Sequence, residues 1–392
     1  MDRIDLSSPK LAINGGNKIR EKSWADNITT GEEEKIALSR VIDSGYLSLF
    51  EGSHTPDTPF SFHGGPEVQA LENEWNEYYG SKYSVSVNSA TSGLYMAIGA
   101  LGIGYGDEVI VSPYTMSACA MAPMIYGAIP VFADVDDMGS LDPKSIKTLV
   151  SPRTKAILVV HQFGIPAQMN EIMEIANEYN LKVIEDCAQA HGAMFKNQKV
   201  GSFGDIGCFS FYGNKVLTTG EGGMCTTNNP ILNKKMRILR DHGMSREKKY
   251  WHDMVGFNYR MTNLQAAIGV AQLERIESIH KNRREYENCY RAALSKKNFT
   301  FQNNLNNRQR ITWLVSFLMD EDVNREEYIA NLKEKGIDAR PFFYLLSDME
   351  IYKEYCSSGT PVAKKISSLG LNLPTYESLK SIVEINSIFS NV

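Results

Sequence analysis

The sequence predicts an α/β protein with a large domain built on a mostly parallel central sheet and a smaller C-terminal α+β domain. Between residues 66 and 227, short apolar runs alternate with helical patterns. This order is typical of a parallel sheet and its connecting helices. After residue 263 the pattern changes to a long charged helix and a mixed segment. The chain of 392 residues is long enough for both domains.

This change of pattern sets the expected domain boundaries. Residues 1–30 form a polar arm, residues 31–262 the large domain, and residues 263–392 a connecting helix with the small domain. One long helix is predicted at the start of the last segment, because apolar residues recur there at helical spacing. A strand over Thr312–Leu318 and a helix over Arg325–Lys335 follow it.

The large domain begins with helices and then alternates strands with helices. Helices are predicted over Thr30–Ser44, Pro66–Tyr79, Ser92–Leu101 and Ala167–Tyr179, and strands over Tyr83–Val87, Asp107–Val111, Val131–Asp134, Ala156–His161 and Lys182–Asp186. The strands are apolar without alternation, as expected when helices cover both faces of a sheet. Thr29 or Thr30 is the expected N-cap of the first helix. Glycine and proline in residues 45–65 predict a long loop, a kind of segment that is often functional.

Composition excludes several classes of protein. The hydrophobic share of 43% and the charged share of 22% are ordinary for a globular chain. A net charge of −5 offers no general basic footprint for nucleic acid, which leaves only a local basic patch as an alternative. No apolar run could span a bilayer, and the N-terminus lacks the apolar segment of a signal peptide. The six cysteines have no paired spacing, so we expect no metal site and a reducing, cytoplasmic environment.

Lys215 is the first candidate for catalysis. It follows the apolar run Phe209–Phe211 and precedes the glycine-dense segment Gly220–Gly223, whose backbone allows close approach to a ligand. A lysine with a lowered pKa forms Schiff bases with carbonyl compounds. A solvated surface lysine is the ordinary alternative.

Two further segments supply partners for this lysine. Asp186 ends an apolar strand, at the edge where open α/β sheets bind ligands. A buried carboxylate there keeps the ring nitrogen of pyridoxal phosphate (PLP) protonated, although a helix cap is the simpler interpretation. Ala90, Thr91 and Ser92 open a helix directly after the strand Tyr83–Val87. Free amides at a helix N-terminus form an anion site.

These segments resemble the DegT/DnrJ/EryC1/StrS family of sugar aminotransferases, from about Leu11 to Leu379. The resemblance implies a type I aminotransferase fold and PLP as the cofactor. It implies that Lys215 binds PLP as a Schiff base and carries the proton during transamination. It also implies that Asp186 pairs with the pyridine nitrogen.

The resemblance assigns the other cofactor contacts as well. Gln189 would lie near the phenolic oxygen of PLP, and Ala90, Thr91 and Ser210 would hold the phosphate. Asn258 would reach the phosphate of the neighbouring subunit, which implies a homodimer with two shared active sites. Many members have an aromatic residue that stacks on the cofactor ring. Met116 occupies that position here, and Tyr114 is the alternative for the stacking contact.

The cues for the substrate point in two directions. The segment Gly336–Tyr344 resembles members that make 4-amino sugars on nucleotide carriers, perosamine synthases in particular. The segment Leu11–Gly16 is instead similar to cyclitol and aminobenzoate-type members. We give the first more weight and expect a nucleotide-diphosphate-linked 4-keto-6-deoxy sugar as acceptor, with L-glutamate as donor. His191 and Arg340 are the candidate substrate contacts.

Several alternatives stay open. The acceptor could be a cyclitol ketone or a small phosphorylated ketone, and the donor could be glutamine. A PLP-dependent lyase or dehydratase would use the same residues, although dehydratases of the superfamily have histidine where this chain has Lys215. The sequence argues against a dinucleotide-binding domain, because Gly102–Gly106 precedes a strand instead of following one. A non-catalytic regulator would need a DNA-binding segment, for which residues 1–30 leave no room.

Overall fold

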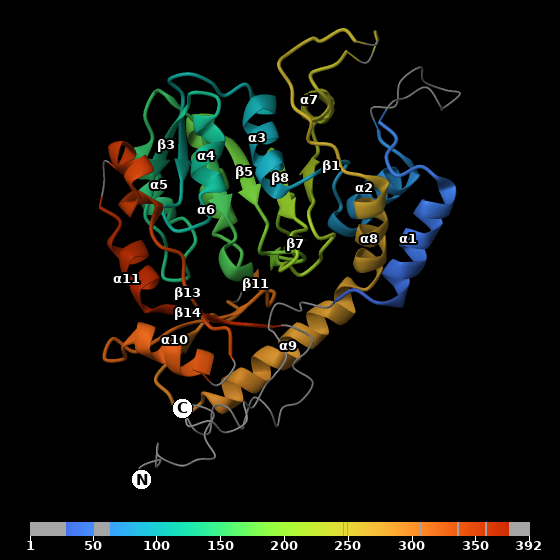
Figure 1. Ribbon diagram of the computed structural model, residues 1–392. Coiled ribbons are helices and arrows are strands. Elements are labelled where there is room, and N and C mark those ends of the chain that lie inside the picture. Colours follow the sequence, from blue (N-terminus) through green and yellow to red (C-terminus); the bar gives the residue numbers. More distant parts are fainter. Residues whose placement is uncertain are drawn as a thin grey trace.

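The computed structural model describes residues 29–50, 63–245, 247–248, 250–305, 307–334, 337–356 and 359–375. Nearly all of the arm predicted over residues 1–30, including Leu11–Gly16, lies outside these ranges, as does most of the predicted long loop. The described chain forms a large α/β domain beside a smaller antiparallel sheet (Figure 1).

The large domain is centred on a seven-stranded sheet with the order β1-β9-β8-β5-β4-β2-β3. Its strands are β1 (Tyr83–Val87), β2 (Glu108–Val111), β3 (Ile129–Phe132), β4 (Thr154–Val160), β5 (Lys182–Asp186), β8 (Ile206–Ser210) and β9 (Gly223–Thr227). The five strands from β8 to β3 pair in parallel, whereas β9 pairs antiparallel with both β1 and β8. The prediction of a mostly parallel sheet is therefore confirmed.

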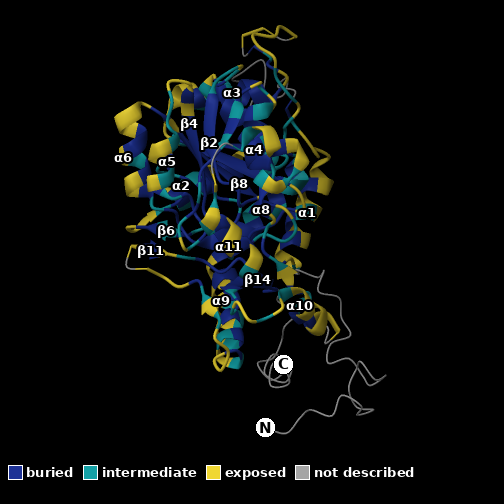
Figure 2. Ribbon diagram, turned by 90° about the vertical axis from the view of Figure 1, so that its left-hand side faces the viewer, coloured by how far each residue is buried: buried dark blue, intermediate teal, exposed yellow. Residues whose placement is uncertain are grey.

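Helices cover both faces of this sheet, so its strands are buried (Figures 1 and 2). The helices of the large domain are α1 (Glu32–Ser44), α2 (Pro66–Tyr79), α3 (Ala90–Leu101), α4 (Ala118–Met124), α5 (Pro143–Leu149), α6 (Met169–Tyr179) and α7 (Pro230–Arg240), with a 3-10 turn at Gln162–Gly164. Successive strand residues point to opposite faces. Cys208 therefore joins the core formed with α3, α4 and α7, and Phe209 packs 5.1 Å from Trp75 of α2.

The smaller domain is built on a four-stranded antiparallel sheet with the order β10-β12-β14-β13. Its elements are α9 (Ile276–Ala293), β10 (Thr300–Phe301), β12 (Val315–Leu318), α10 (Arg325–Glu334), β13 (Arg340–Pro341), α11 (Pro361–Leu369) and β14 (Gly370–Leu373), with 3-10 turns at Leu346–Asp348 and Glu350–Tyr355. A third small sheet joins β6 (Met194–Phe195) and β7 (Gln198–Lys199) to β11 (Arg308–Gln309). Tyr290 of α9 and Leu332 of α10 pack on Phe317 of β12 to form the core. Among the described residues, no helix has the length and hydrophobicity that crossing a membrane requires.

Two predictions about helices are wrong. The connecting helix is not continuous: α8 (Asn263–Glu274) ends at Arg275, which has φ −106° and ψ 6°. Its guanidinium donates to the carbonyl of Thr29 and to Glu34, so contacts with the start of α1 interrupt the helix. The N-cap of α1 is Gly31, whose amide donates to Glu34 at 2.5 Å. Thr29 is buried instead and donates to Gln272 at 2.9 Å.

Candidate active site

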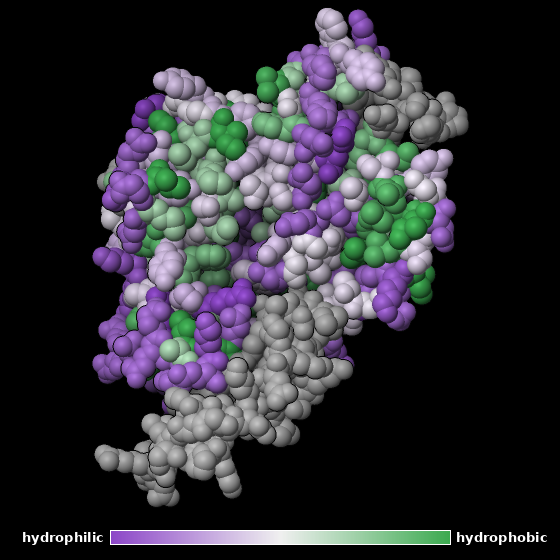
Figure 3. Space-filling model, in the orientation of Figure 1, coloured by the Kyte–Doolittle hydropathy of each residue, from purple (hydrophilic) through white to green (hydrophobic). Residues whose placement is uncertain are grey.

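The two predicted catalytic residues come together at the carboxyl ends of β5 and β8. Asp186 is the last residue of β5 and is paired in register with Cys208 of the neighbouring strand. Lys215 lies in the loop that follows β8. Figure 3 shows this face of the molecule recessed below the ends of these strands. The arrangement agrees with the rule that open α/β sheets bind ligands beyond the carboxyl ends of their strands.

The surroundings of Lys215 favour its neutral amine. Its Nζ lies 4.0 Å from the centre of the Trp313 ring. Arg283 donates to the carbonyls of Lys215 and Trp313 at 3.1 and 2.8 Å, and thereby holds the loop in place. Loss of hydration lowers the pKa of Lys215 to about 8, although the charge of Asp186 opposes this shift. Near neutral pH a larger share of this amine is nucleophilic than in an ordinary lysine.

The carboxylate of Asp186 is buried and only partly satisfied by the protein. One oxygen accepts the amide of Ala188 at 2.9 Å, and the other accepts the thiol of Cys119 at 3.0 Å. Burial and the charge of Asp186 raise the pKa of Cys119, so its thiol keeps the proton that it donates. A thiol is a weak donor, and a carboxylate has room for further hydrogen bonds. The geometry therefore leaves Asp186 able to accept a proton donor from a ligand.

The start of α3 forms a backbone cradle. The side chain of Ser89 caps this helix by accepting the amide of Ser92 at 3.1 Å. Ala90 and Thr91 are the first helical residues, so helical carbonyls do not accept their amides. A Cβ at Gly223 would lie 2.8 Å from the nitrogen of Ala90 and 2.7 Å from the carbonyl oxygen of Phe209. Only glycine lets β9 pass so close behind this turn, which is suited to an oxyanion.

Gln189 is buried beside a strained turn. Its Oε1 accepts the amide of Phe163 at 2.6 Å. Phe163 has φ 51°, which is rare for a bulky residue. Because the oxygen is engaged, the NH₂ group is the part of Gln189 that remains to donate to a ligand. Ser210, the third predicted phosphate contact besides the α3 amides, ends β8 and is also buried.

The two candidates for ring stacking differ in exposure. Met116 is exposed over 59% of its surface, just before α4. Tyr114 is fully buried and packs against Phe163 and Phe342. Of these two side chains, only that of Met116 is therefore accessible at the surface.

The two predicted substrate contacts lie in different surroundings. His191 is fully buried among the rings of Trp75, Phe209 and Phe211. Burial and the nearby charge of Lys215 lower the pKa of His191 to about 3, so this imidazole is neutral. Arg340 lies on the surface and pairs with Asp338 at 2.6 Å. A role for either residue in substrate binding stays a prediction.

Asn258 lies at the surface and is far from Lys215 in the sequence. Its carbonyl accepts the side chain of Asn88, the residue before the cap of α3, at 3.3 Å. Its backbone also forms an isolated antiparallel bridge with Asp241, which brings together the two ends of the segment of residues 241–258. The predicted contact of Asn258 with a neighbouring subunit stays a prediction.

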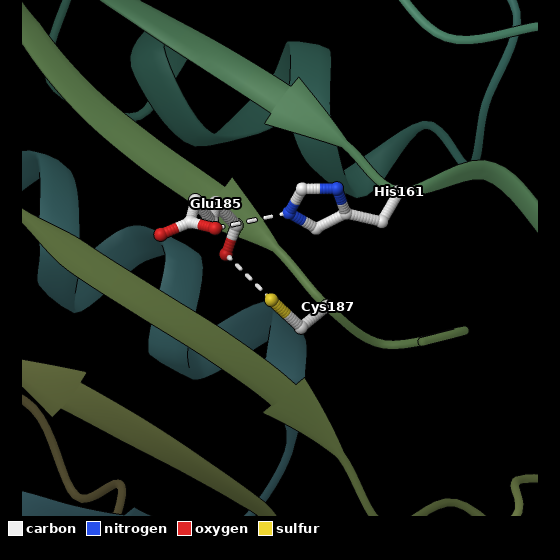
Figure 4. A group of neighbouring side chains, drawn as sticks. All are labelled: His161, Glu185 and Cys187. Carbon is white, nitrogen blue, oxygen red and sulfur yellow. Dashed lines mark hydrogen bonds and ion pairs between the residues drawn. The ribbon is translucent and has the colours of Figure 1, made fainter. Parts of the chain in front are cut away.

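His161, Glu185 and Cys187 form a buried cluster with metal-ligating groups on the other side of β5 (Figure 4). The carboxylate of Glu185 accepts the amides of Gly201, Phe203 and Gly204 at 2.7, 2.8 and 2.7 Å and faces His161 Nε2 at 3.1 Å. His161 Nδ1 accepts the amide of Ala167 at 3.1 Å, so Nε2 carries the proton and donates to Glu185. These groups are already used in hydrogen bonds, and the cluster is a structural network.

Sequence reasoning missed three residues of the site: Cys119, Trp313 and Arg283. Cys119 is 67 positions from Asp186, and only the packing of α4 against the sheet brings them together. The residues present fit PLP: a nucleophilic amine, a buried carboxylate with free acceptor capacity, and an amide cradle backed by Gly223.

Comparisons with known proteins agree with this fit. A profile of the DegT/DnrJ/EryC1/StrS aminotransferase family matches residues 57–389. GDP-perosamine synthase of Caulobacter vibrioides is 40% identical over 328 residues, which cover 82% of this chain and 88% of that protein. GDP-perosamine synthase of Escherichia coli O157:H7 is 39% identical over 90% of this chain and 92% of its own. The crystal structure of DesI, in the presence of its TDP-sugar product, has a TM-score of 0.86 and 26% identity, covering 98% of this chain and 95% of that one.

Proposed function

Because this chain belongs to the DegT/DnrJ/EryC1/StrS aminotransferase family, we propose that it moves an amino group from L-glutamate to a nucleotide-diphosphate-linked 4-keto-6-deoxy sugar, with PLP bound at Lys215. The observation that carries the proposal is the amine of Lys215, which shares one sheet edge with Asp186 and the α3 cradle. Two relatives are named GDP-perosamine synthase, and the DesI structure was determined in the presence of its TDP-sugar product. Both findings support a nucleotide sugar as the acceptor.

PLP, when bound, supplies an electron sink for the negative charge that develops at the Cα of the amino donor. Lys215 removes the proton from that Cα through its neutral Nζ. Asp186 holds a proton on the ring nitrogen through its free acceptor capacity. Gln189 donates its NH₂ group to the phenolic oxygen. The amides of Ala90 and Thr91, with the hydroxyl of Ser210, hold the phosphate.

The decisive experiment compares two lysines. Purified protein with added PLP should show a visible absorption band that bleaches with L-glutamate and returns with the keto-sugar nucleotide. Lys215→Ala should lack the band and lose turnover, whereas Lys155→Ala, an exposed lysine on β4, should keep both. Full turnover in Lys215→Ala would refute the mechanism, and a wild-type protein without the band would refute PLP as cofactor.

The choice of substrates needs separate tests. A panel of GDP-, UDP- and TDP-linked 4-keto-6-deoxy sugars, a cyclitol ketone and a small phosphorylated ketone would identify the acceptor by its return of the band. Glutamine in place of glutamate would test the donor. A product that has lost water or a substituent, without gain of nitrogen, would instead assign a lyase or dehydratase.

A homodimer with shared active sites is the second part of the proposal. Exposed apolar side chains occur on α1 and the turn after it, and in residues 241–258: Ile36, Ile42, Tyr46, Leu47, Tyr250, Trp251 and Val255. Figure 3 shows hydrophobic residues gathered where α1 and α8 lie in Figure 1. Apolar patches of this kind favour burial against a second copy. The cytoplasmic location proposed for the dimer is supported by the six cysteines, all free thiols.

Mixing two variants tests the sharing. Lys215→Ala and Asn258→Ala homodimers each lack one component in both sites. In a mixed dimer, the native Lys215 of one chain would meet the partner subunit's Asn258, so one complete site forms and activity at limiting PLP rises. A fully active monomer, or a mixture no more active than the average of the two variants, would refute shared sites.

A further inference from the structure

A polar cavity of about 280 Å³ lies in the small domain, between α9 and the segment that leads into β12. Arginines dominate its lining: Arg284, Arg291 and Arg310 surround a single glutamate, Glu287. Three asparagines and Thr312 complete it. Three positive charges against one negative charge leave the cavity with a net charge of +2. None of these residues belongs to the proposed cofactor or catalytic contacts.

Arg310 presents an unused hydrogen-bonding edge. Its side chain is only 7% exposed, and its Nη1 donates to both oxygens of Glu287 at 2.6 and 2.7 Å. Its Nε and Nη2 have no hydrogen-bond partner in the part of the chain that the structure describes. These two groups lie on one edge of the guanidinium and form the fork that binds oxyanions in bidentate fashion. The same edge of Arg40 binds both oxygens of Glu67 at 3.0 and 2.8 Å.

The other groups in the cavity do not neutralise this edge. Burial raises the pKa of Glu287, but the charges and hydrogen bonds of Arg310, Thr312 and Arg291 outweigh it, so the pKa is lowered and the group is ionised. Arg291 is already occupied, because it donates to Glu287 at 2.8 Å and to Asn303 at 3.0 Å. Arg284 is exposed at the rim and adds a positive charge. The lining therefore combines excess positive charge with two donors of Arg310 that are buried in the wall of the cavity and lack an acceptor in the part of the chain that the structure describes.

The cavity is close in the chain to the reactive lysine. Thr312 donates to Glu287 at 2.5 Å, and the next residue, Trp313, places its ring over Lys215. Arg283, which holds the Lys215 loop, precedes Arg284 on α9. A ligand in the cavity would thus contact the segment that shapes one side of the active site.

We propose that this cavity is a second ligand site, which binds a phosphate-bearing small molecule through the charge of Arg284 and through the Nε–Nη2 edge of Arg310, which a turn of this side chain exposes to the ligand. A doubly charged phosphate or diphosphate group matches the net charge of the lining, and the bidentate fork matches the geometry of its oxygens. The inference does not depend on which sugar the enzyme aminates.

Titration calorimetry with inorganic pyrophosphate tests the site on the PLP-loaded protein, in which the cofactor fills the cradle of α3. Arg310→Lys keeps a positive charge for Glu287 but removes the fork, so binding should weaken about tenfold or more. Arg284→Gln removes only a rim charge and should weaken binding by a smaller factor. Lys353→Gln, at an exposed lysine outside the cavity, is the matched control and should bind as the wild type does.

The contrary outcomes are equally clear. The proposal would be overturned if the wild type did not bind pyrophosphate. It would also be overturned if Arg310→Lys bound pyrophosphate as tightly as Arg284→Gln does. If Arg310→Lys does not fold, Arg284→Gln decides, together with the weakening of wild-type binding by added salt. Succinate binding as tightly as pyrophosphate would assign the cavity to carboxylates and refute the choice of phosphate.

Discussion

Glu185 and Asp186 are neighbouring buried carboxylates at the end of β5, yet their surroundings differ. Because successive strand residues point to opposite faces, one side chain faces the loop after β7 and the other faces α4. Glu185 accepts three backbone amides and the imidazole of His161. Asp186 accepts one backbone amide and one thiol.

The difference separates a structural carboxylate from a functional one. A carboxylate can accept about four hydrogen bonds, and Glu185 accepts four from the protein. Asp186 accepts two, one of them from a weak donor. Complete satisfaction within the chain makes a group rigid and unavailable, whereas incomplete satisfaction leaves it for a ligand. Exposure would not have distinguished the two residues, because both are buried.

The largest expected effect comes from Asp186→Asn. The amide is similar in shape but removes the negative charge that would hold a proton on the ring nitrogen, so turnover should fall by roughly 10²–10⁴-fold. Initial rates at saturating PLP, glutamate and acceptor measure it. Asp322→Asn, at an exposed position, is the control. A rate within about threefold of wild type would remove the functional half of the comparison.

Glu185→Gln should instead affect stability. The amide cannot accept from all four donors, and its own NH₂ group would face backbone amides, so unfolding free energy should fall by about 3 kcal/mol. Urea denaturation followed by circular dichroism measures this loss. The turnover of the folded fraction should stay near that of the wild type. A variant as stable as the wild type but as inactive as Asp186→Asn would show that the two carboxylates do not have separate roles.

The pH dependence of the reactivity of Lys215 shows which of the two carboxylates acts on this lysine through its charge. The neutral amine is the reactive form, so the rate of PLP capture by cofactor-free protein should rise with pH and level off above about 8. Asp186 raises this pKa against the effect of burial. The midpoint should therefore move to lower pH in Asp186→Asn and stay in place in Glu185→Gln. Stopped-flow absorbance measures both, and a midpoint near 10 in the wild type would contradict the buried environment.

The smallest effect is expected at Cys119, the weak donor to Asp186. Cys119→Ala removes the hydrogen bond and should lower turnover about fivefold, equivalent to about 1 kcal/mol. Cys119→Ser supplies a stronger donor and should restore or exceed the wild-type rate. Steady-state rates of both variants give the measurement. If serine is as harmful as alanine, the contact serves packing alone.

Much of the fold could be predicted from the order of elements along the chain. The bounds of β1 and β5 agree with the prediction because local residues mark their ends: Asn180 ends α6 in the left-handed region just before β5, and Ser89 caps α3 just after β1. The break between α8 and α9 could not be predicted, because Arg275 leaves the helix to contact Glu34, 241 positions away. Helical periodicity continues through the break and conceals it.

The same division applies to the candidate site. Lys215, Asp186 and the start of α3 could be proposed from the sequence because they lie at or just after strand ends, and strand ends of a parallel sheet meet at one edge. Cys119, Trp313 and Arg283 of this site were missed, as was Arg310 of the proposed second site, because their importance depends on residues far away in the sequence. An unused guanidinium edge, as in Arg310, becomes visible only when every hydrogen bond around it has been located. The family membership suggested by the resemblance is confirmed.

The close passage of β9 behind the start of α3 has a consequence for how this protein would respond to mutation. The proposed phosphate contacts at Ala90 and Thr91 are backbone amides, so most side-chain replacements there would leave the recognising groups in place. Gly223 belongs to no proposed ligand contact, yet any larger residue would displace the cradle, since even a methyl group would lie 2.8 Å from the nitrogen of Ala90. In a saturation-mutagenesis map of cofactor retention, this glycine should therefore be far less tolerant than Ala90 or Thr91, although it lies one strand behind the ligand.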